Sequence, residues 1–181
     1  FFFNTGGHIY RNHITRYIPS ISPAWYISFE IAPKKHVTTK SSIVHFTATG
    51  QHRYNQIGSM IPAVWFNPSS TRLHICTALN GRNLCYDSQT LPLHKYTKVE
   101  IAQVQMHGTE YFYVILVGGQ RVYQTVNTHA RYFHNVKVYK ANPWQLAADA
   151  DIKNLVFRNL KRGMCFSFIR RFVFTNPIHV E

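Results

Sequence analysis

Residues 76–85 read CTALNGRNLC, and this stretch predicts a β-hairpin. Asn80 and Gly81 stand at its centre, and Asn-Gly is the dipeptide that a two-residue type I′ turn favours, because both central positions need a positive φ. A turn at this dipeptide sets the register of the two flanking strands and places Cys76 directly opposite Cys85. The stretch therefore links a local turn to two cysteines that face each other across a sheet.

The facing cysteines are predicted to form a disulfide. They fall on a non-hydrogen-bonded pair, where the Cα atoms of antiparallel strands lie ~4.5 Å apart, and a disulfide accepts that separation. A redox motif or zinc knuckle has two residues between its cysteines, whereas eight separate Cys76 from Cys85. Two unpaired thiols that face each other by chance are the alternative. A disulfide indicates an oxidising, extracellular setting and leaves Cys165 as a free or intermolecular thiol.

The rest of the chain has the pattern of an all-β, two-sheet antiparallel sandwich. Residues 25–31 (WYISFEI) alternate apolar and polar side chains between Pro23 and Pro33, as a half-buried strand does. Turn signals recur about every ten residues, which is typical of a sandwich. Further strands are predicted at residues 42–48, 61–66, 73–78, 84–87, 98–105, 111–117, 121–125, 135–139 and 152–159.

Gly118-Gly119 predicts a second hairpin, in which Ile115 faces Val122. Only residues 144–150, which include three alanines, are predicted to form a turn or two of helix.

The chain divides into two regions of different amino-acid composition. Residues 1–160 are predicted to form the sandwich, and residues 161–181, which begin KRGMCFSFIRRFVF, are predicted to be a basic and aromatic tail, linker or edge segment. No run in the chain approaches the ~18 consecutive apolar residues that a membrane span needs.

The chain is strongly basic. Twenty Lys and Arg residues stand against seven Asp and Glu residues, which gives a net charge of +13 with neutral histidines. Such an excess favours polyanionic partners, among them sulfated or sialylated glycans, anionic lipid surfaces and nucleic acid. A charge that serves solubility alone is the alternative.

Catalytic motifs are not found in the sequence. A glycosidase needs two carboxylates across the sugar, but Glu30 and Glu100 are each expected to be alone on an alternating strand face. Ser59 lacks the Gly-x-Ser-x-Gly frame of a nucleophile. His8 and His13 lie five residues apart, a spacing that pre-arranges no metal site. The sequence therefore predicts a protein that is not an enzyme.

Five runs carry a resemblance to a known family: PAWYISFEIAP at residues 23–33, IPAVWFNPSSTRLHICTALNGRNLCY at residues 61–86, YTKVEIAQ at residues 96–103, YFYVILVGGQRVYQTVNT at residues 111–128, and FHNVKVYKANPWQLAADADIKNLVF at residues 133–157. They resemble the laminin-G-like, concanavalin A-like jelly rolls of animal extracellular proteins, and the similarity covers roughly residues 8–160. The resemblance implies an extracellular adhesion or glycan-binding module.

Many members of that family hold calcium at the rim of the sandwich through Asp and carbonyl oxygens. Asp149 and Asp151 are neighbours in this chain but have no third carboxylate nearby. Because calcium takes six to eight oxygen ligands, no calcium site and no other cofactor is predicted.

Five residues in the predicted loops and turns are the candidate ligand-binding residues: Lys34, Lys35, Arg53, Tyr54 and Arg82. Loops at one end of a sandwich are where such folds bind ligands. An aromatic ring beside a cationic side chain suits both a sugar face and an anionic group. The alternative for each of them is an ordinary solvated loop residue.

The sequence predicts a secreted, non-enzymatic module that binds anionic glycans or extracellular matrix proteins. The alternative is a structural subunit of an extracellular assembly, which self-associates through the sandwich edges and residues 161–181. A nucleic-acid binder is less well supported, because no known reading motif is present and a disulfide argues against the nucleus.

Overall fold

The computed structural model describes residues 6–161. Its strands are β1 (Gly7–His8), β2 (His13–Ile21), β3 (Trp25–Pro33), β4 (Ser41–Thr47), β5 (Ala63–Phe66), β6 (Arg72–Leu79), β7 (Arg82–Thr90), β8 (Thr97–His107), β9 (Glu110–Val117), β10 (Gln120–Asn127), β11 (Phe133–Lys140), β12 (Leu146–Ala147) and β13 (Ala150–Asn159). The predicted tail lies outside the described residues, apart from Lys161.

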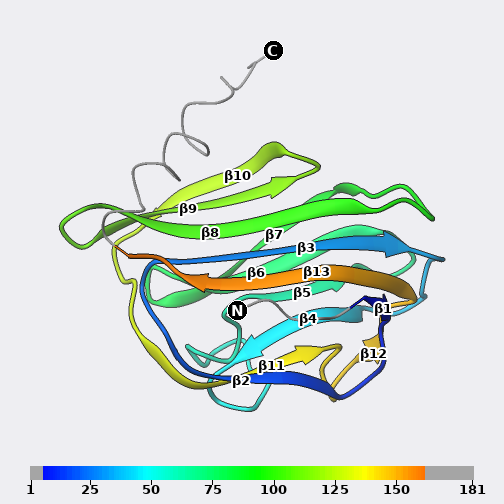
Figure 1. The fold of residues 1–181 in the computed structure, drawn as a ribbon, viewed down its shortest axis with the longest axis horizontal. Coiled ribbons are helices and arrows are strands. Elements are labelled where there is room, and N and C mark those ends of the chain that lie inside the picture. The colour runs from blue at the N-terminus through cyan, green and yellow to red at the C-terminus, as the bar shows by residue number, and fades with distance from the viewer. Residues whose placement is uncertain (1–5, 162–181) are drawn as a thin grey trace.

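The strands form two sheets that pack face to face (Figure 1). Sheet A has the order β1-β13-β3-β8-β9-β10, and sheet B has the order β2-β11-β4-β5-β6-β7, with β12 beside β4. All neighbours are antiparallel except β12 and β4, which are parallel. The fold is the predicted all-β, two-sheet antiparallel sandwich. No helix in the described residues could cross a membrane.

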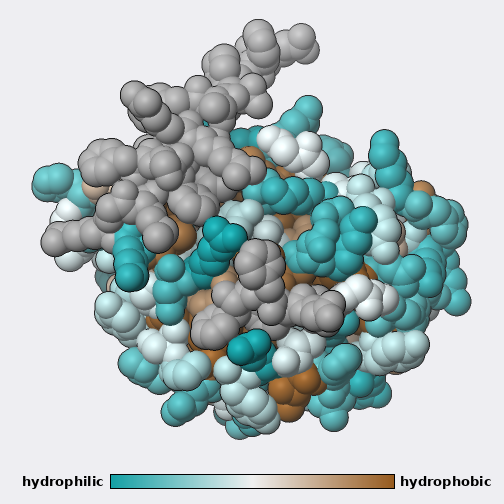
Figure 2. Space-filling view, in the orientation of Figure 1, coloured by the Kyte–Doolittle hydropathy of each residue, from teal (hydrophilic) through white to brown (hydrophobic). Residues whose placement is uncertain are grey.

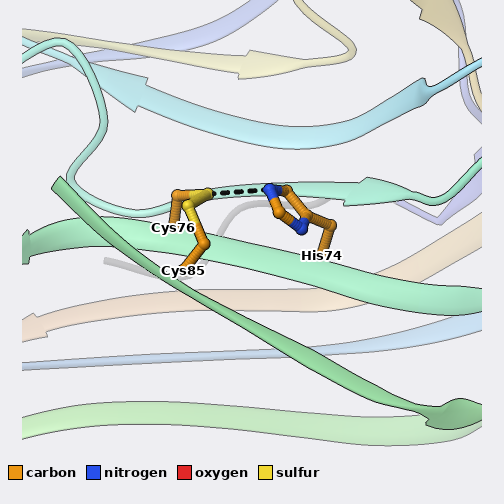
Figure 3. Close-up of side chains that lie close together, drawn as sticks. All are labelled: His74, Cys76 and Cys85. Atoms are coloured by element: carbon orange, nitrogen blue, oxygen red, sulfur yellow. Dashed lines mark hydrogen bonds between the residues drawn. A yellow bond between two sulfur atoms is a disulfide. The ribbon is translucent and has the colours of Figure 1, made fainter. Parts of the chain in front are cut away.

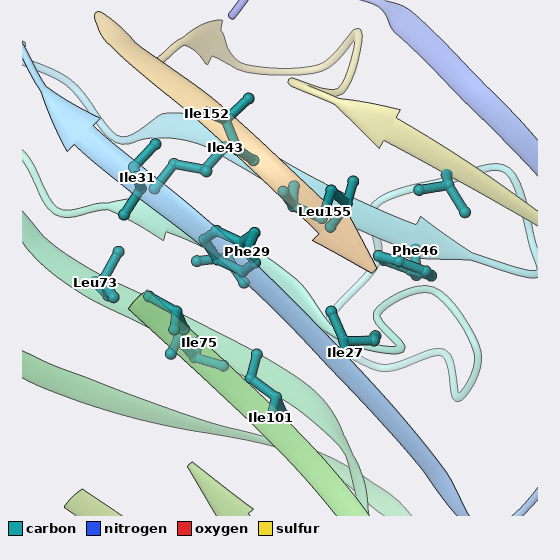
Figure 4. Packing of buried hydrophobic residues seen from close by; sticks show 14 of the residues in the cluster. Ile27, Phe29, Ile31, Ile43, Phe46, Leu73, Ile75, Ile101, Ile152 and Leu155 are labelled. Carbon is teal, nitrogen blue, oxygen red and sulfur yellow. The ribbon is translucent and has the colours of Figure 1, made fainter. Parts of the chain in front are cut away.

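The core lies between the two sheets. The odd positions of β3, from Trp25 to Ile31, are all buried, as the alternation predicts. Tyr26 and Ser28 on the other face are buried too, so the strand is not the half-buried strand that the sequence predicts. Figure 4 shows Ile27, Phe29 and Ile31 of β3 among side chains of β4, β6, β8 and β13. Burial of these branched and aromatic side chains from both sheets supplies the main driving force for the fold.

The predicted register of the first hairpin is confirmed. Asn80 and Gly81 have φ of 51° and 77°, as a type I′ turn requires. Cys76 of β6 pairs with Cys85 of β7, and the two form a disulfide with a Cα–Cα distance of 4.0 Å.

The predicted register of the second hairpin is wrong beyond its first pairs. Gln120 pairs with Val117 as expected, but a bulge follows Arg121, so Ile115 pairs with Tyr123 rather than with Val122. A bulge places one extra residue on one strand and shifts every later pair.

Every predicted strand overlaps an observed one, but the two-residue strand β1 and two longer segments differ from the prediction. Residues 144–150 form no helix: Leu146 pairs with Ser41 of β4 in the short strand β12. β2 was not predicted, because it is an edge strand that contains Pro19 and fully buries only Ile18 and Ile21.

Asn127 ties the two sheets together at one end of the sandwich. It ends β10 of sheet A and is 1% exposed, and its Oδ1 accepts hydrogen bonds from the backbone N–H groups of Asn80 and His129, each at 3.0 Å. Its Nδ2 donates to Gln103 Oε1 at 2.7 Å. The Asn80 side chain in turn donates a hydrogen bond from Nδ2 to Val126 O at 2.9 Å. The turn of sheet B is thus fixed to the end of sheet A.

Replacing Asn127 with Leu should lower the free energy of unfolding by about 2–4 kcal/mol, because buried donors and an acceptor lose their partner. Urea unfolding measures the change. The control is Gln124→Leu, an exposed position on the same strand, which should change stability by less than about 0.5 kcal/mol. Equal effects of the two substitutions would contradict the role of the buried amide.

The disulfide should appear in peptide mapping without reductant as one linked fragment that contains Cys76 and Cys85. Reducing it should lower the free energy of unfolding by about 2–3 kcal/mol, since it closes only a short loop. Alkylation of both thiols in native, unreduced protein would show that the bond does not form.

Candidate functional site

An aromatic and histidine cluster lies on the outer face of sheet B. Val64 and Phe66 of β5 enter the core, so the strand alternation turns Trp65 to the opposite face. His45 of β4 lies beside Trp65 with ring centroids 5.6 Å apart, and both side chains are fully buried. His74 of β6 lies on the other side of Trp65, at 5.9 Å. These three rings form the floor of the cluster.

Two loops place further rings over this floor. His52 and Tyr54 come from the loop between β4 and β5, and Trp144 comes from the loop after β11. The His52 ring contacts both Tyr54, at 5.8 Å, and Trp144, at 6.5 Å with an interplanar angle of 24°. Trp144 is 37% exposed and Tyr54 is 45% exposed. Lys40 adds a cation, because its Nζ lies 5.6 Å from the centre of the Trp65 ring. We call His45, His52, Tyr54, Trp65, His74 and Trp144 the aromatic–histidine cluster.

His45 holds the loop that carries Trp144. Asn142 Nδ2 donates to His45 Nδ1 at 2.9 Å, so the imidazole proton is on Nε2, which donates to Ser59 O at 2.6 Å. The Oδ1 of Asn142 accepts from the backbone N–H groups of Trp144 and Gln145, each at 3.0 Å. One neutral histidine therefore connects β4 to both covering loops.

Burial keeps His45 and His52 neutral. It lowers the pKa of His45 to about 4, an effect that the hydrogen bond to Ser59 opposes and that nearby His52 reinforces. The pKa of His52 is also lowered, first by burial and then by the charge of Lys40. Burial likewise lowers the pKa of Lys40. At neutral pH His45 and His52 are thus uncharged rings beside Lys40.

The disulfide lies next to His74 (Figure 3). His74 Nδ1 donates to Asp87 Oδ1 at 2.7 Å, and the same carboxylate oxygen accepts from Asn67 Nδ2 at 2.8 Å. The Nε2 atom of His74 lies 3.1 Å from Cys76 Sγ. Among the described residues, His74, Cys76 and Cys85 are the group of potential metal ligands that the fold gathers. The sequence predicted no metal site, although His74-x-Cys76 on a strand opposite Cys85 is a pattern that could have indicated one.

The structure brings three of the five candidate ligand-binding residues to one region. Arg53 and Tyr54 lie in the loop that covers the cluster, and Arg82 begins β7 at the hairpin turn. Asn83, next to Arg82, donates from Nδ2 to Tyr54 O at 2.6 Å, so the loop and the hairpin are joined.

The remaining two, Lys34 and Lys35, form ion pairs. Lys34 Nζ lies 2.9 Å from Asp151 Oδ1, and Lys35 Nζ lies 3.0 Å from Asp149 Oδ2. Asp151, through a hydrogen bond to Lys34, raises the pKa of that lysine. Asp149 and Asp151, considered from the sequence as calcium ligands, are thus lysine partners in the structure.

Lys34 and Lys35 lie at the opposite end of the sandwich from Arg82. They follow the end of β3, whereas Trp25, at its start, lines a shallow hollow together with Gly81 of the hairpin turn. A strand of nine residues spans about 30 Å. The five candidate residues therefore do not converge on one ligand.

The expectation that Glu30 and Glu100 are each alone is wrong. Glu30 pairs with Lys98 and Glu100 pairs with Ser28, so the two carboxylates are diagonal neighbours on the outer face of sheet A. Each is held by a lysine: Lys98 Nζ lies 2.9 Å from Glu100, and Lys153 Nζ lies 3.5 Å from Glu30.

Comparisons with known proteins show the fold. No family model and no curated protein matches the chain. A heptameric SAP-like pentraxin from Limulus polyphemus is similar over 90% of this chain and 81% of its own, with 9% identity and a TM-score of 0.55. An endo-β-1,4-glucuronan lyase from the fungus Trichoderma reesei is similar over 84% and 79%, with 10% identity and a TM-score of 0.51.

The binding domain of botulinum neurotoxin DC in complex with SialylT is similar over 83% of this chain, with 12% identity and a TM-score of 0.50. This chain spans 36% of the toxin chain. At such low identities these neighbours establish a lectin-like jelly-roll fold. The finer assignment to the laminin-G family stays a prediction.

Acid should destabilise the protein through His45. Its pKa in the folded chain, about 4, is below its ordinary value of 6.5, so the unfolded chain binds the proton first. The stability that depends on neutral His45 is complete above pH 6.5 and is lost as the pH falls toward 4, by about 3 kcal/mol.

Denaturant unfolding between pH 7.5 and pH 4 measures this loss. His45→Gln should remove most of the pH dependence in that interval, and His134→Gln, at an exposed position, should leave it unchanged. The same pH dependence in His45→Gln as in the natural chain would contradict the assignment.

Proposed function

We propose that this chain is a secreted, non-enzymatic module that binds anionic glycans, and that the exposed part of the aromatic–histidine cluster is its binding surface. The observation that carries the proposal is the exposed Trp144 ring, packed on His52 beside Tyr54 and near Lys40. Flat aromatic rings offer an apolar face to the C–H groups of a sugar, and nearby polar or charged groups fix its orientation.

The surface is also held in place before a ligand binds. Asn142 caps the backbone at Trp144 and Gln145, and Gln145 Oε1 accepts a hydrogen bond from Trp65 Nε1 at 3.3 Å. Arg11 donates from Nη2 to Pro143 O at 2.7 Å in the same loop. A loop that is already ordered loses little conformational entropy on binding, which favours affinity.

The charge of the chain supports an anionic ligand. The net charge is +13, and hydrophilic side chains cover most of the described surface in the view of Figure 2. Lys34 and Lys35 are neutralised locally by their aspartate partners, whereas Arg53 and Arg82 lie in the elements around the cluster. Sulfate or carboxylate groups on a bound glycan would be attracted to that side of the molecule.

Secretion is supported by the disulfide.

Binding to heparin across a salt series tests the proposal. Affinity should fall steeply as salt rises, because exposed charge pairs are screened beyond ~8 Å at physiological ionic strength. Trp144→Ala should weaken binding at least about 10-fold at constant salt, since it removes the stacking ring. Lys40→Gln should weaken binding and reduce its salt dependence.

Two control variants match these changes elsewhere on the surface. Tyr132→Ala removes another exposed ring, and Lys95→Gln removes another exposed charge. Equal losses in the controls would show that a diffuse basic surface binds the glycan, and would refute the site. No binding at any salt would favour the alternative of a structural subunit, which size-exclusion chromatography would reveal as self-association.

A further inference from the structure

His74, Cys76 and Cys85 present three potential ligand atoms on one face of sheet B. His74 and Cys76 are two residues apart on β6, so their side chains leave the strand on the same side. Cys85 lies directly opposite Cys76 on β7. The ring nitrogen and the two sulfurs lie within 4.8 Å of one another. Figure 3 shows the three side chains side by side. Imidazole and thiolate are the ligands that zinc prefers.

The hydrogen bonds of His74 prepare it as a ligand. Its Nδ1 donates to Asp87, so the lone pair of Nε2 points away from the carboxylate and toward the sulfurs. Asn67 Nδ2 donates to the same Asp87 oxygen at 2.8 Å, which fixes the position of the carboxylate. A carboxylate that accepts from the second nitrogen of a histidine is the usual support of a zinc-bound imidazole.

The phenol oxygen of Tyr54 lies at the remaining corner of the arrangement. It is 3.0 Å from His74 Nε2, 3.6 Å from Cys76 Sγ and 3.7 Å from Cys85 Sγ. In a tetrahedral zinc site the nitrogen and sulfur ligands are about 3.5 Å apart, and two sulfurs are about 3.8 Å apart, given the usual bond lengths. The 3.1 Å from His74 Nε2 to Cys76 Sγ is close to the nitrogen–sulfur length, whereas the S–S bond, at 2.03 Å, is much shorter than the separation of two zinc-bound sulfurs.

We propose that reduction of the Cys76–Cys85 disulfide opens a site for one thiophilic divalent cation, Zn²⁺, bound by His74 Nε2 and the two thiolates. A dithiol or phosphine supplies two electrons to the S–S bond, and the two sulfurs take up two protons. Zn²⁺ then replaces those two protons, which are released to solvent. Tyr54 or a water takes the fourth position. The disulfide and the metal site are mutually exclusive states of the same two sulfurs.

Cobalt titration of the full chain tests the proposal. A Cys165→Ser background removes the third thiol. The protein is reduced without oxygen by a trialkyl phosphine, the reductant is removed, and Co²⁺ is added as a coloured substitute for Zn²⁺. The reduced chain should bind one Co²⁺ with thiolate-to-cobalt charge-transfer absorption, which Zn²⁺ then abolishes. The oxidised chain, with the same sequence, should show neither signal.

Variants separate the full site from binding by two thiols alone. His74→Gln should weaken Co²⁺ binding at least about 10-fold, and Asp87→Asn should weaken it about 10- to 100-fold through loss of histidine orientation. His134→Gln, an exposed histidine elsewhere, should leave it unchanged.

Thermal unfolding of the reduced chain gives a second readout, because a ligand that binds the folded state raises its melting temperature. Zn²⁺ should raise the melting temperature of the reduced natural chain and not that of His74→Gln. The proposal is overturned by a reduced chain that binds no Co²⁺, by equal binding in His74→Gln, or by a reduced chain that neither stays folded nor refolds when Zn²⁺ is added.

Discussion

The type I′ turn at Asn80-Gly81 is the constraint on which much of sheet B depends. The turn sets the register of β6 against β7, and a slip of one residue would send every side chain of one strand to the opposite face. Cys76 would then no longer face Cys85. The same register brings the turn to Asn127, whose buried amide joins it to sheet A. One local backbone preference thus decides a covalent link and a contact between sheets.

The outer face of sheet B combines two tasks that are often separate in a protein. His45 and Trp65 are buried like core residues, yet they support the rings and loops that reach solvent. Because Asn142 bonds both to His45 and to the backbone at Trp144, the protonation of a buried histidine and the position of an exposed indole are coupled. Stability and ligand binding therefore depend on the same few hydrogen bonds in this region.

The parts of the fold that follow local rules could be predicted from the sequence. The turn at Asn80-Gly81 and the alternation of residues 25–31 specify the first hairpin and the clearest core strand, because each depends on neighbours within a few residues. The bulge after Arg121 and the edge strand β2 could not be predicted, since their pairing is decided by partners elsewhere in the sheet.

The site was less accessible to sequence reasoning than the fold. The aromatic–histidine cluster depends on the hydrogen bond between His45 and Asn142. These residues are 97 positions apart, and no local pattern indicates that contact. Lys34 and Arg82 looked equivalent as basic loop residues, but the direction of β3 places them at opposite ends of the sandwich. Which end of the sandwich a loop residue lies at depends on the strand topology, and that topology is a property of the whole chain.

The turn at Asn80-Gly81 also bears on deamidation, the slow conversion of an asparagine side chain to a carboxylate. Asn followed by Gly is prone to deamidation, because the unhindered glycine lets its backbone nitrogen attack the side-chain amide carbon. In the folded chain the Asn80 amide donates to Val126 O and accepts from Thr128 N, which restrains the rotation that the attack needs. Folding therefore protects the Asn80 side-chain amide from deamidation. Opening of the hairpin would expose it, and the resulting carboxylate could no longer donate to Val126.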